Sequence, residues 1–274
     1  MKFLPIFILS LLTFVSCKKK TLSPDIFSTE TIQLQTHSLQ TYTVIKNTKY
    51  LVVFESGLGD DHTIWNKKNL PSLLSTNQDV LLYDRAGYGN SGKSDLPRTI
   101  ATLSSELGSV IDQYSNNRTL ILVGHSIAGM ILRDYALKNP EKIAGILLID
   151  PSHEAYNQPT QEQEDLIYSQ FLKAYGADYG ATTEARQIVE DTQYMATLQN
   201  LPNVPIVVIT SMKEDAEHDA SDKQKWFNAH ELFKVGISDF THIVTKKSGH
   251  YIFLDEPNLV LENLNLLISK LAKE

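Results

Sequence analysis

Short apolar runs alternate with longer segments of helical periodicity from residue 30 onward. The runs 51–54, 120–123 and 146–149 are continuously apolar, as in central strands that helices cover on both faces. Segment 99–114 repeats apolar residues at three- and four-residue steps, and a final helix is expected to begin near Pro257. The alternation predicts an α/β fold, a mostly parallel sheet with helices on both faces.

Eight strands are predicted, at 30–36, 40–46, 50–55, 79–84, 119–124, 143–149, 204–210 and 241–246. The first two lack an intervening helix, so we expect an antiparallel hairpin. Segment 153–200 contains no convincing strand and is flanked by Pro151 and Pro202. We therefore predict a core formed by 29–152 and 201–274, with 153–200 as a helical lid.

Residues 1–17 have the pattern of an export signal: Lys2, an apolar run, then Ser16 and Cys17. The run is too short for a bilayer, which needs roughly 20 residues. Residues 14–17, Phe-Val-Ser-Cys, resemble a bacterial lipobox, with Phe14 where leucine is usual. This resemblance implies a diacylglycerol anchor on Cys17, residues 18–28 as a tether, and a place on the periplasmic or outer face of a bacterial cell envelope; the alternative is an ordinary secretory signal.

Composition narrows the possible partners. The 274 residues carry a formal net charge of -7, and apart from Lys18 to Lys20 the basic residues are scattered, so we expect no nucleic-acid partner. Cys17 is the single cysteine, which excludes an internal disulfide and a thiolate zinc cluster. His230-Glu231 lacks the second histidine of an HExxH helix, and no metal site is predicted.

Residues 119–129 run from a predicted strand through a tight turn into a helix, with Ser126 at the apex. Gly124, Ala128 and Gly129 are small enough for such a turn, which is typical of a nucleophile elbow; a helix cap is the alternative role for the serine. The elbow would expose the Ser126 hydroxyl at the carboxyl ends of the strands, where open α/β sheets bind ligands.

The six residues 124–129, Gly-His-Ser-Ile-Ala-Gly, resemble the GxSxG motif of the α/β-hydrolase superfamily, with Ala128 in place of the last glycine. The resemblance covers the chain from about residue 30 to 274 and implies that fold, with Ser126 as nucleophile. The haloalkane dehalogenase and epoxide hydrolase branches use aspartate at this position, so the serine argues against them.

A serine hydroxyl needs an imidazole within hydrogen-bond reach to take its proton. Of the eight histidines, His250 is the one that lies between the last predicted strand and the last helix. The superfamily's histidine occupies the same place, and Ser248-Gly249-His250 fits its pattern. We therefore predict His250 as the general base, the alternative being a solvated loop histidine.

Two carboxylates compete for the third position of the triad. Asp150 ends the strand predicted at 143–149, whereas Glu214 follows the strand at 204–210. Most members of the superfamily place the acid after the later strand, which favours Glu214. Segment 148–153, Trp226 and segment 249–252 resemble a subgroup whose acid follows the earlier strand, and we predict Asp150 with Glu214 as the alternative.

The negative charge that develops on the substrate oxygen needs preorganised backbone donors. One donor is expected to be the amide of Ile127. Residues 55–59, Glu-Ser-Gly-Leu-Gly, resemble the family's oxyanion loop, which implies the amide of Leu58 as the second donor; a structural turn is the alternative.

Residues 87–92 match the GxGxxG pattern of dinucleotide sites, but Pro97 prevents a helix from opening at Gly92. We therefore predict no organic cofactor and no metal. The predicted function is hydrolysis of carboxylic esters of small molecules through an acyl-serine intermediate. Thioesterase, amidase and carbon–carbon bond hydrolase are alternatives with the same triad, and a non-catalytic binding scaffold is the alternative from another class.

Overall fold

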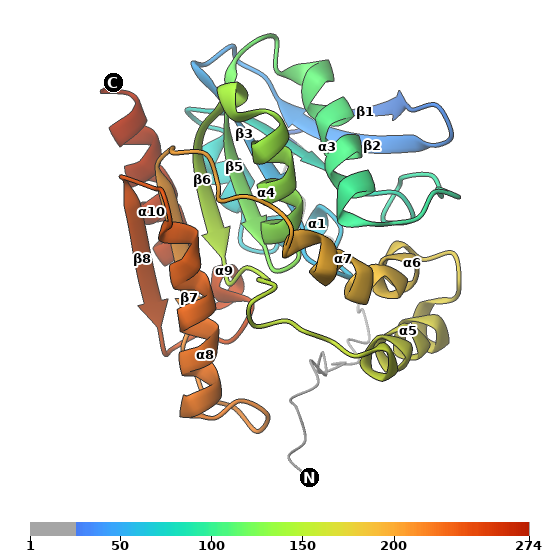
Figure 1. Ribbon diagram of the computed structural model, residues 1–274. Helices are drawn as coiled ribbons and strands as arrows, with labels where there is room; N and C mark the ends of the chain where they lie inside the picture. The colour runs from blue at the N-terminus through green and yellow to red at the C-terminus, as the bar shows by residue number, and fades with distance from the viewer. Residues whose placement is uncertain (1–25, 274) are drawn as a thin grey trace.

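The computed structural model describes residues 26–273, which form one α/β unit around a single sheet (Figure 1). The sheet has eight strands in the order β1-β2-β4-β3-β5-β6-β7-β8. Strands β3 to β8 are parallel, while β2 pairs antiparallel with both β1 and β4. The strands are β1 (Ser28–Gln33), β2 (Ser38–Val44), β3 (Tyr50–Glu55), β4 (Asp79–Tyr83), β5 (Thr119–His125), β6 (Ile143–Ile149), β7 (Ile206–Ser211) and β8 (Phe240–Thr245).

Helices cover both faces of the sheet, as the apolar runs predict. Alternate residues of one strand enter opposite cores: Leu51 and Val53 pack with α3 and α4, whereas Val52 and Phe54 pack with α10. The helices outside segment 153–200 are α1 (Thr63–Asn66), α2 (Leu70–Leu74), α3 (Ile100–Tyr114), α4 (Ala128–Lys138), α8 (Ala220–Glu231), α9 (Ile252–Asp255) and α10 (Pro257–Leu271), with short 3₁₀ turns η1 (Pro140–Lys142) and η3 (Leu232–Lys234).

The predicted antiparallel hairpin is present, but both strands begin two residues earlier than expected. The turn is closed by a 2.8 Å hydrogen bond from the Leu34 amide to the His37 carbonyl, and the Gln33 side chain donates to the same carbonyl. His37 is buried against Glu106 of α3. These contacts fix the turn at a place that no glycine, proline or asparagine marks in the sequence.

Segment 153–200 is helical throughout its regular parts and connects β6 to β7. It contains α5 (Gln161–Tyr175), α6 (Gly180–Glu184), η2 (Ala185–Gln187) and α7 (Ile188–Met195). Figure 1 shows these helices beside the ends of the strands to which the arrowheads point. We refer to 153–200, which the sequence predicts to be a helical lid, as the lid segment.

A buried ion-pair network ties the lid segment to the sheet. The Arg85 guanidinium donates to Glu55 at 2.7 Å and to both oxygens of Glu184 at 2.8 and 3.0 Å. All three side chains are at most 2% exposed. Burial raises the pKa of Glu55, and the charge of Arg85 opposes that rise, so the ionised form of Glu55 depends on the guanidinium.

Replacing Arg85 with methionine is therefore expected to lower the free energy of unfolding by about 3–5 kcal/mol, the cost of leaving buried charges unpaired. Urea titrations at pH 8 and pH 5 measure it, with the smaller loss at pH 5, where the orphaned carboxyl groups take up protons. Lys93→Met is the matched control, because Lys93 pairs with Asp178 of the same two segments at the exposed surface. Equal small losses for both variants would contradict the assigned role of Arg85.

The export signal 1–17, the lipobox cysteine Cys17 and most of the tether 18–28 lie outside the described residues. Between residues 26 and 273 no helix has the length and apolar character needed to cross a bilayer.

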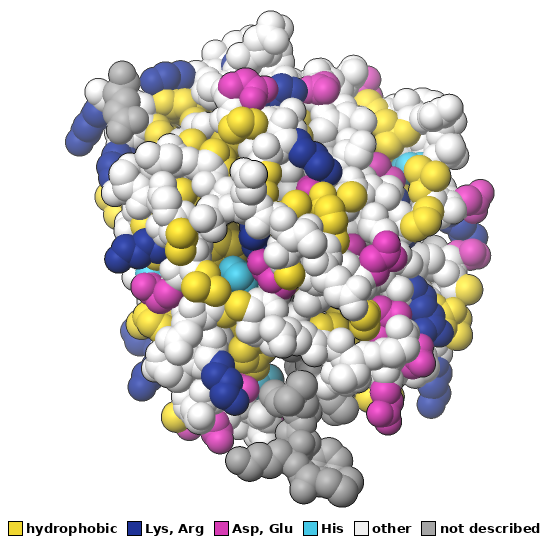
Figure 2. Space-filling view, in the orientation of Figure 1, with side chains coloured by type: hydrophobic (Ala, Val, Ile, Leu, Met, Phe, Trp, Pro, Cys, Tyr) yellow, Lys and Arg dark blue, Asp and Glu magenta, His cyan; other side chains and the backbone are white. Residues whose placement is uncertain are grey.

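On the face drawn in Figure 2, Lys and Arg side chains are scattered among acidic and apolar ones.

Candidate active site

Ser126 stands at a strained turn between β5 and α4. Its φ of 58° lies in the left-handed region, which residues other than glycine rarely adopt. The turn is held from both sides: the Ser126 amide donates to the carbonyl of Ile149 at 3.2 Å, and its carbonyl accepts from the Ser152 amide at 2.8 Å. The neighbouring strand β6 thus fixes the bend that presents the serine.

The small residues around Ser126 are required by close packing. A Cβ on Gly124 would lie 2.6 Å from a methyl group of Leu132, and one on Gly129 would lie 2.5 Å from the ring of Pro151. Both distances are shorter than side chains tolerate. Helix α4 can therefore begin directly beneath the strand ends only because these two positions lack side chains.

His250 follows β8 and is hydrogen-bonded to Asp150. The distance from His250 Nδ1 to Asp150 Oδ2 is 2.8 Å. The other carboxylate oxygen, Oδ1, accepts from the Ser211 amide at 2.9 Å and from Trp226 Nε1 at 2.8 Å. Burial alone raises the pKa of Asp150, but the hydrogen bond and charge interaction with His250 outweigh it, so the net pKa lies below the usual value. Asp150 is therefore a buried carboxylate, and Nδ1 of His250 carries the proton.

Glu214, the alternative acid, lies in the exposed loop between β7 and α8. Its neighbour Asp215 turns back on the same loop to His218, with a 2.8 Å contact. The structure thus brings Asp150, and not Glu214, to the hydrogen-bonding position of His250 Nδ1.

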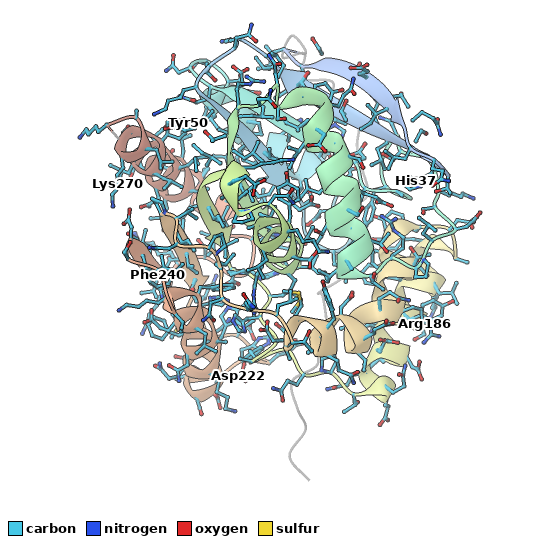
Figure 3. All side chains as sticks on the ribbon, turned by 45° about the horizontal axis from the view of Figure 1, so that its top comes forward. His37, Tyr50, Arg186, Asp222, Phe240 and Lys270 are labelled. Carbon is cyan, nitrogen blue, oxygen red and sulfur yellow. The ribbon has the colours of Figure 1, made fainter. Side chains whose placement is uncertain are left out.

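Ser126 and His250 line one cavity of about 440 Å³ at the carboxyl ends of the strands. Core and lid segment both contribute walls. Helix α8 contributes Asp222 and Lys225 to the wall, and Figure 3 labels Asp222. The larger apolar side chains in the lining are those of Leu58, Ile127, Met130, Ile167, Phe171 and Ile188. Apolar atoms make up most of the cavity surface, which suits an uncharged apolar group.

Two further carboxyl groups, those of Asp60 and Asp191, line this cavity. Burial raises the pKa of Asp60 to about 6 and that of Asp191 to about 8. Asp191, on lid helix α7, also accepts the amide of Ile100 at the start of α3 at 2.7 Å. At pH 7 Asp191 is thus mostly neutral, which leaves the lid side of the cavity with little negative charge.

Leu58, in the loop after β3, and Ile127, the residue directly after Ser126, both border the cavity. Among the hydrogen bonds within residues 26–273, neither the Leu58 nor the Ile127 amide acts as a donor. The adjacent Gly59 has a φ of 87° and donates its amide to Tyr88 at 3.2 Å, which holds the loop after β3 in place. Both amides are thus available for a ligand oxygen.

His125 has a role that sequence reasoning missed. Its Nε2 lies 3.0 Å from the carbonyl oxygen of His250, which can only accept, so Nε2 carries the proton. Burial lowers the pKa of His125 well below its usual value and keeps the ring neutral. The residue before the serine therefore ties the elbow to the backbone of the histidine loop.

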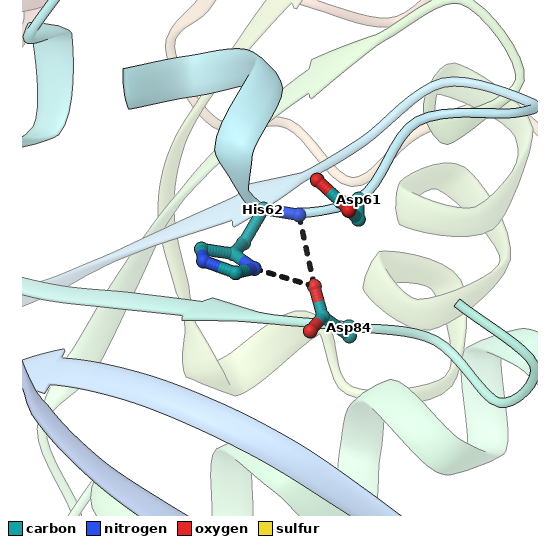
Figure 4. A group of neighbouring side chains, drawn as sticks. All are labelled: Asp61, His62 and Asp84. Atoms are coloured by element: carbon teal, nitrogen blue, oxygen red, sulfur yellow. Dashed lines mark hydrogen bonds and ion pairs between the residues drawn. The ribbon is translucent and has the colours of Figure 1, made fainter. Parts of the chain in front are cut away.

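Asp61, His62 and Asp84 form a cluster of potential metal-ligating side chains, shown in Figure 4. Asp84 Oδ1 accepts from the amide of His62 at 3.0 Å and lies 2.6 Å from its Nδ1. Asp84 Oδ2 accepts from Tyr42 and from the Asn90 amide, each at 3.0 Å. Four donors already occupy this carboxylate, which fits a residue that fixes the loops after β3 and β4.

The glycine-rich segment 87–92 contacts the lid segment. The Gly180 amide donates to the carbonyl of Gly87 at 3.0 Å, and a Cβ on Gly87 would lie 2.7 Å from the nitrogen of Gly180. Gly87 also has a φ of 80°. Gly87 is thus explained by its close backbone contact with the start of α6, whereas a Cβ on Gly89 would meet the side chain of Asp84 and one on Gly92 would meet Ser38.

A serine in a left-handed strand-to-helix turn and a histidine paired with a buried aspartate, both at the carboxyl ends of one sheet, define the class of α/β-hydrolases. The family model described as alpha/beta hydrolase fold matches residues 50–205, and the chain belongs to that family.

The chain is also similar to individual proteins. The uncharacterized protein YqjL of Bacillus subtilis is 28% identical over 209 residues, which are 76% of this chain and 79% of that protein. A (lyso)-N-acylphosphatidylethanolamine lipase of Mus musculus is 29% identical over 103 residues, 36% of this chain and 30% of that protein. A putative epoxide hydrolase of Pseudomonas aeruginosa shares the fold, with a TM-score of 0.67 and 16% identity over 90% of this chain and 97% of that one.

Proposed function

We propose that the protein is a serine hydrolase that cleaves carboxylic esters through an acyl-serine intermediate. The observation that carries the proposal is the hydrogen bond from His250 Nδ1 to the buried Asp150 carboxylate. With Nδ1 protonated, Nε2 is the nitrogen that takes the hydroxyl proton of Ser126, and both residues line the same cavity.

The reaction follows from these positions. Ser126 Oγ attacks the ester carbonyl carbon while its proton passes to His250 Nε2, and the carbonyl oxygen becomes an oxyanion facing the amides of Leu58 and Ile127. When the carbon–oxygen bond to the alcohol breaks, His250 returns the proton to the leaving oxygen. A water molecule then attacks the acyl-serine with the same proton transfers and releases the acid.

The cavity favours a neutral substrate with an apolar acyl part, because apolar atoms make up most of its surface and burial holds Asp191 mostly neutral at pH 7. The mouse relative that is named a lipase adds support for ester chemistry. Thioesters, amides and activated carbon–carbon bonds can use the same residues, so the substrate panel has to include them.

The direct test uses the purified protein with p-nitrophenyl esters of increasing acyl length, matched thioesters and anilides, and a fluorophosphonate probe. We expect the esters to give the highest kcat/KM and the probe to label Ser126, identified by mass spectrometry of the labelled peptide. A preference for thioesters would indicate a thioesterase, and a preference for anilides would indicate an amidase. No turnover together with no label would favour a non-catalytic scaffold.

A further inference from the structure

Helix α8 contacts Asp150 and Pro151, the two residues that follow β6. Trp226 donates to Asp150 Oδ1, and one turn later His230 Nε2 lies 2.7 Å from the carbonyl oxygen of Pro151. The next residue, Glu231, contacts Nδ1 of His242 on β8. Figure 3 labels Asp222 on α8 and Phe240 at the start of β8, which lie at the same side of the molecule. A chain of polar contacts therefore joins this edge strand to the residue after Asp150.

The protons of His230 can be assigned from its partners. A carbonyl oxygen only accepts, so Nε2 carries a hydrogen and donates to Pro151. Burial lowers the pKa of His230 to about 3, so the ring is neutral and Nδ1 is a bare acceptor. Thr210 Oγ1 lies 2.5 Å from this nitrogen. The hydroxyl hydrogen of Thr210 must therefore point at His230.

The next link follows from the single hydrogen of a hydroxyl group. Thr210 Oγ1 also lies 2.7 Å from His242 Nε2, and with its hydrogen already used it can only accept there. Nε2 of His242 thus carries a hydrogen. Nδ1 of the same ring faces the Glu231 carboxyl group, so that contact also needs a proton. Because the Glu231 side chain is 38% exposed, water stabilises its ionised form and the proton belongs on the imidazole.

We propose that His242 is held as an imidazolium by Glu231 and that the directed chain His242, Thr210, His230, Pro151 carbonyl positions Asp150 for its bond to His250. The inference rests on the proposed function in that Asp150 is the triad acid. Loss of the extra proton would leave either two acceptors facing each other at Thr210 or a bare nitrogen against a carboxylate. His230 and His242 are accordingly positioning residues.

The surroundings of His242 are consistent with this state. Its ring stacks on Phe227 of α8 with centroids 4.6 Å apart and planes 9° apart, and its side chain is 6% exposed. The titratable groups of α8 in this hydrogen-bond chain are Glu231 and His230. Asp150 and His153 also act on the charge of His230. The carboxylate of Glu231 favours a cation at His242, and neutral His230 does not oppose it.

Protonation can be measured without turnover. Long-range ¹⁵N–¹H correlation spectra of the histidine side chains at pH 7.5, assigned through His242→Gln and His230→Gln, should show His242 protonated on both nitrogens and His230 with its hydrogen on Nε2. A neutral His242, or a His230 protonated on Nδ1, would overturn the proposal even if ester hydrolysis is confirmed. If the spectrum is as expected but the protein has no esterase activity, the hydrogen-bond chain is confirmed and only its link to catalysis is wrong.

Glu231→Gln tests the coupling to the active site. The amide can still accept from Nδ1 but carries no charge, so it no longer stabilises an imidazolium at His242. We expect the alkaline limb of the pH profile of kcat/KM to move down by about one unit, the size of a typical charge-partner effect. Glu262→Gln on α10, an exposed site, removes the same charge and should leave the profile unchanged. If Glu231→Gln lowers the thermal midpoint but leaves the pH profile in place, its role is only structural and the coupling is wrong.

Discussion

Replacing Ser126 with alanine is expected to lower kcat for p-nitrophenyl esters by a factor of about 10⁶, because loss of the nucleophile of a serine triad removes the acyl-enzyme route altogether. Residual hydrolysis above the rate in buffer would come from the backbone donors at Leu58 and Ile127 and from binding in the cavity. Single-turnover assays at high enzyme concentration measure this residual rate. Labelling by the fluorophosphonate should be lost in the same variant.

The fold should survive this substitution. Alanine faces the same left-handed backbone as serine at position 126, and the hydrogen bonds that hold the turn use backbone atoms of Ser126, which the variant retains. We expect the thermal midpoint to change by about 2 °C or less. Ser109→Ala on the exposed face of α3 is the control and should keep full activity. Labelling that persists in Ser126→Ala would identify another nucleophile and end the assignment.

The sheet could be predicted well where strands are buried on both faces. Residues 51–54, 120–123 and 146–149 are apolar without interruption because helices cover both sides, and β3, β5 and β6 contain them. The edge hairpin begins two residues before the position that the sequence predicts, because its turn depends on the burial of His37 against Glu106 of α3, 69 positions further along the chain. Local pattern carries no information about such a contact.

The acid could not be chosen from chain order, because Asp150 and Glu214 follow neighbouring strands of one sheet. What separates them is environment. Asp150 has a φ of 43° directly at the end of β6 and receives the amide at the end of β7, whereas Glu214 is solvated in a loop. Only a resemblance to one subgroup favoured Asp150 beforehand.

The supporting histidines could not be predicted, since their spacing in the chain has no period. His125 meets the carbonyl of His250, and His230 meets that of Pro151. His242 meets Thr210 from the neighbouring strand. Adjacent parallel strands and a helix bring these residues together, so their pairing depends on the topology of the sheet. The one local signal was the position of His125 next to the serine.

Asp150→Asn is expected to lower kcat by a factor of about 10⁴, with little change in KM. The geometry gives the reason. Oδ1 of residue 150 accepts two hydrogen bonds, from Ser211 and Trp226, so the asparagine carbonyl oxygen will stay there and its NH₂ group will face His250. An NH₂ group donates to Nδ1 and thereby forces the imidazole proton onto Nε2, the nitrogen that has to be bare to accept the proton of Ser126.

Glu214→Gln makes the same chemical change in the exposed loop and should leave kcat within about twofold of the original, as surface substitutions away from a site usually do. Parallel kinetics on both variants, with histidine side-chain ¹⁵N spectra to read the tautomer of His250, distinguish the two carboxylates. A large loss in Glu214→Gln with an active Asp150→Asn would transfer the acid role to Glu214. It would also require the loop between β7 and α8 to move toward His250 during turnover, because in the present structure the hydrogen bond of Nδ1 is made to Asp150.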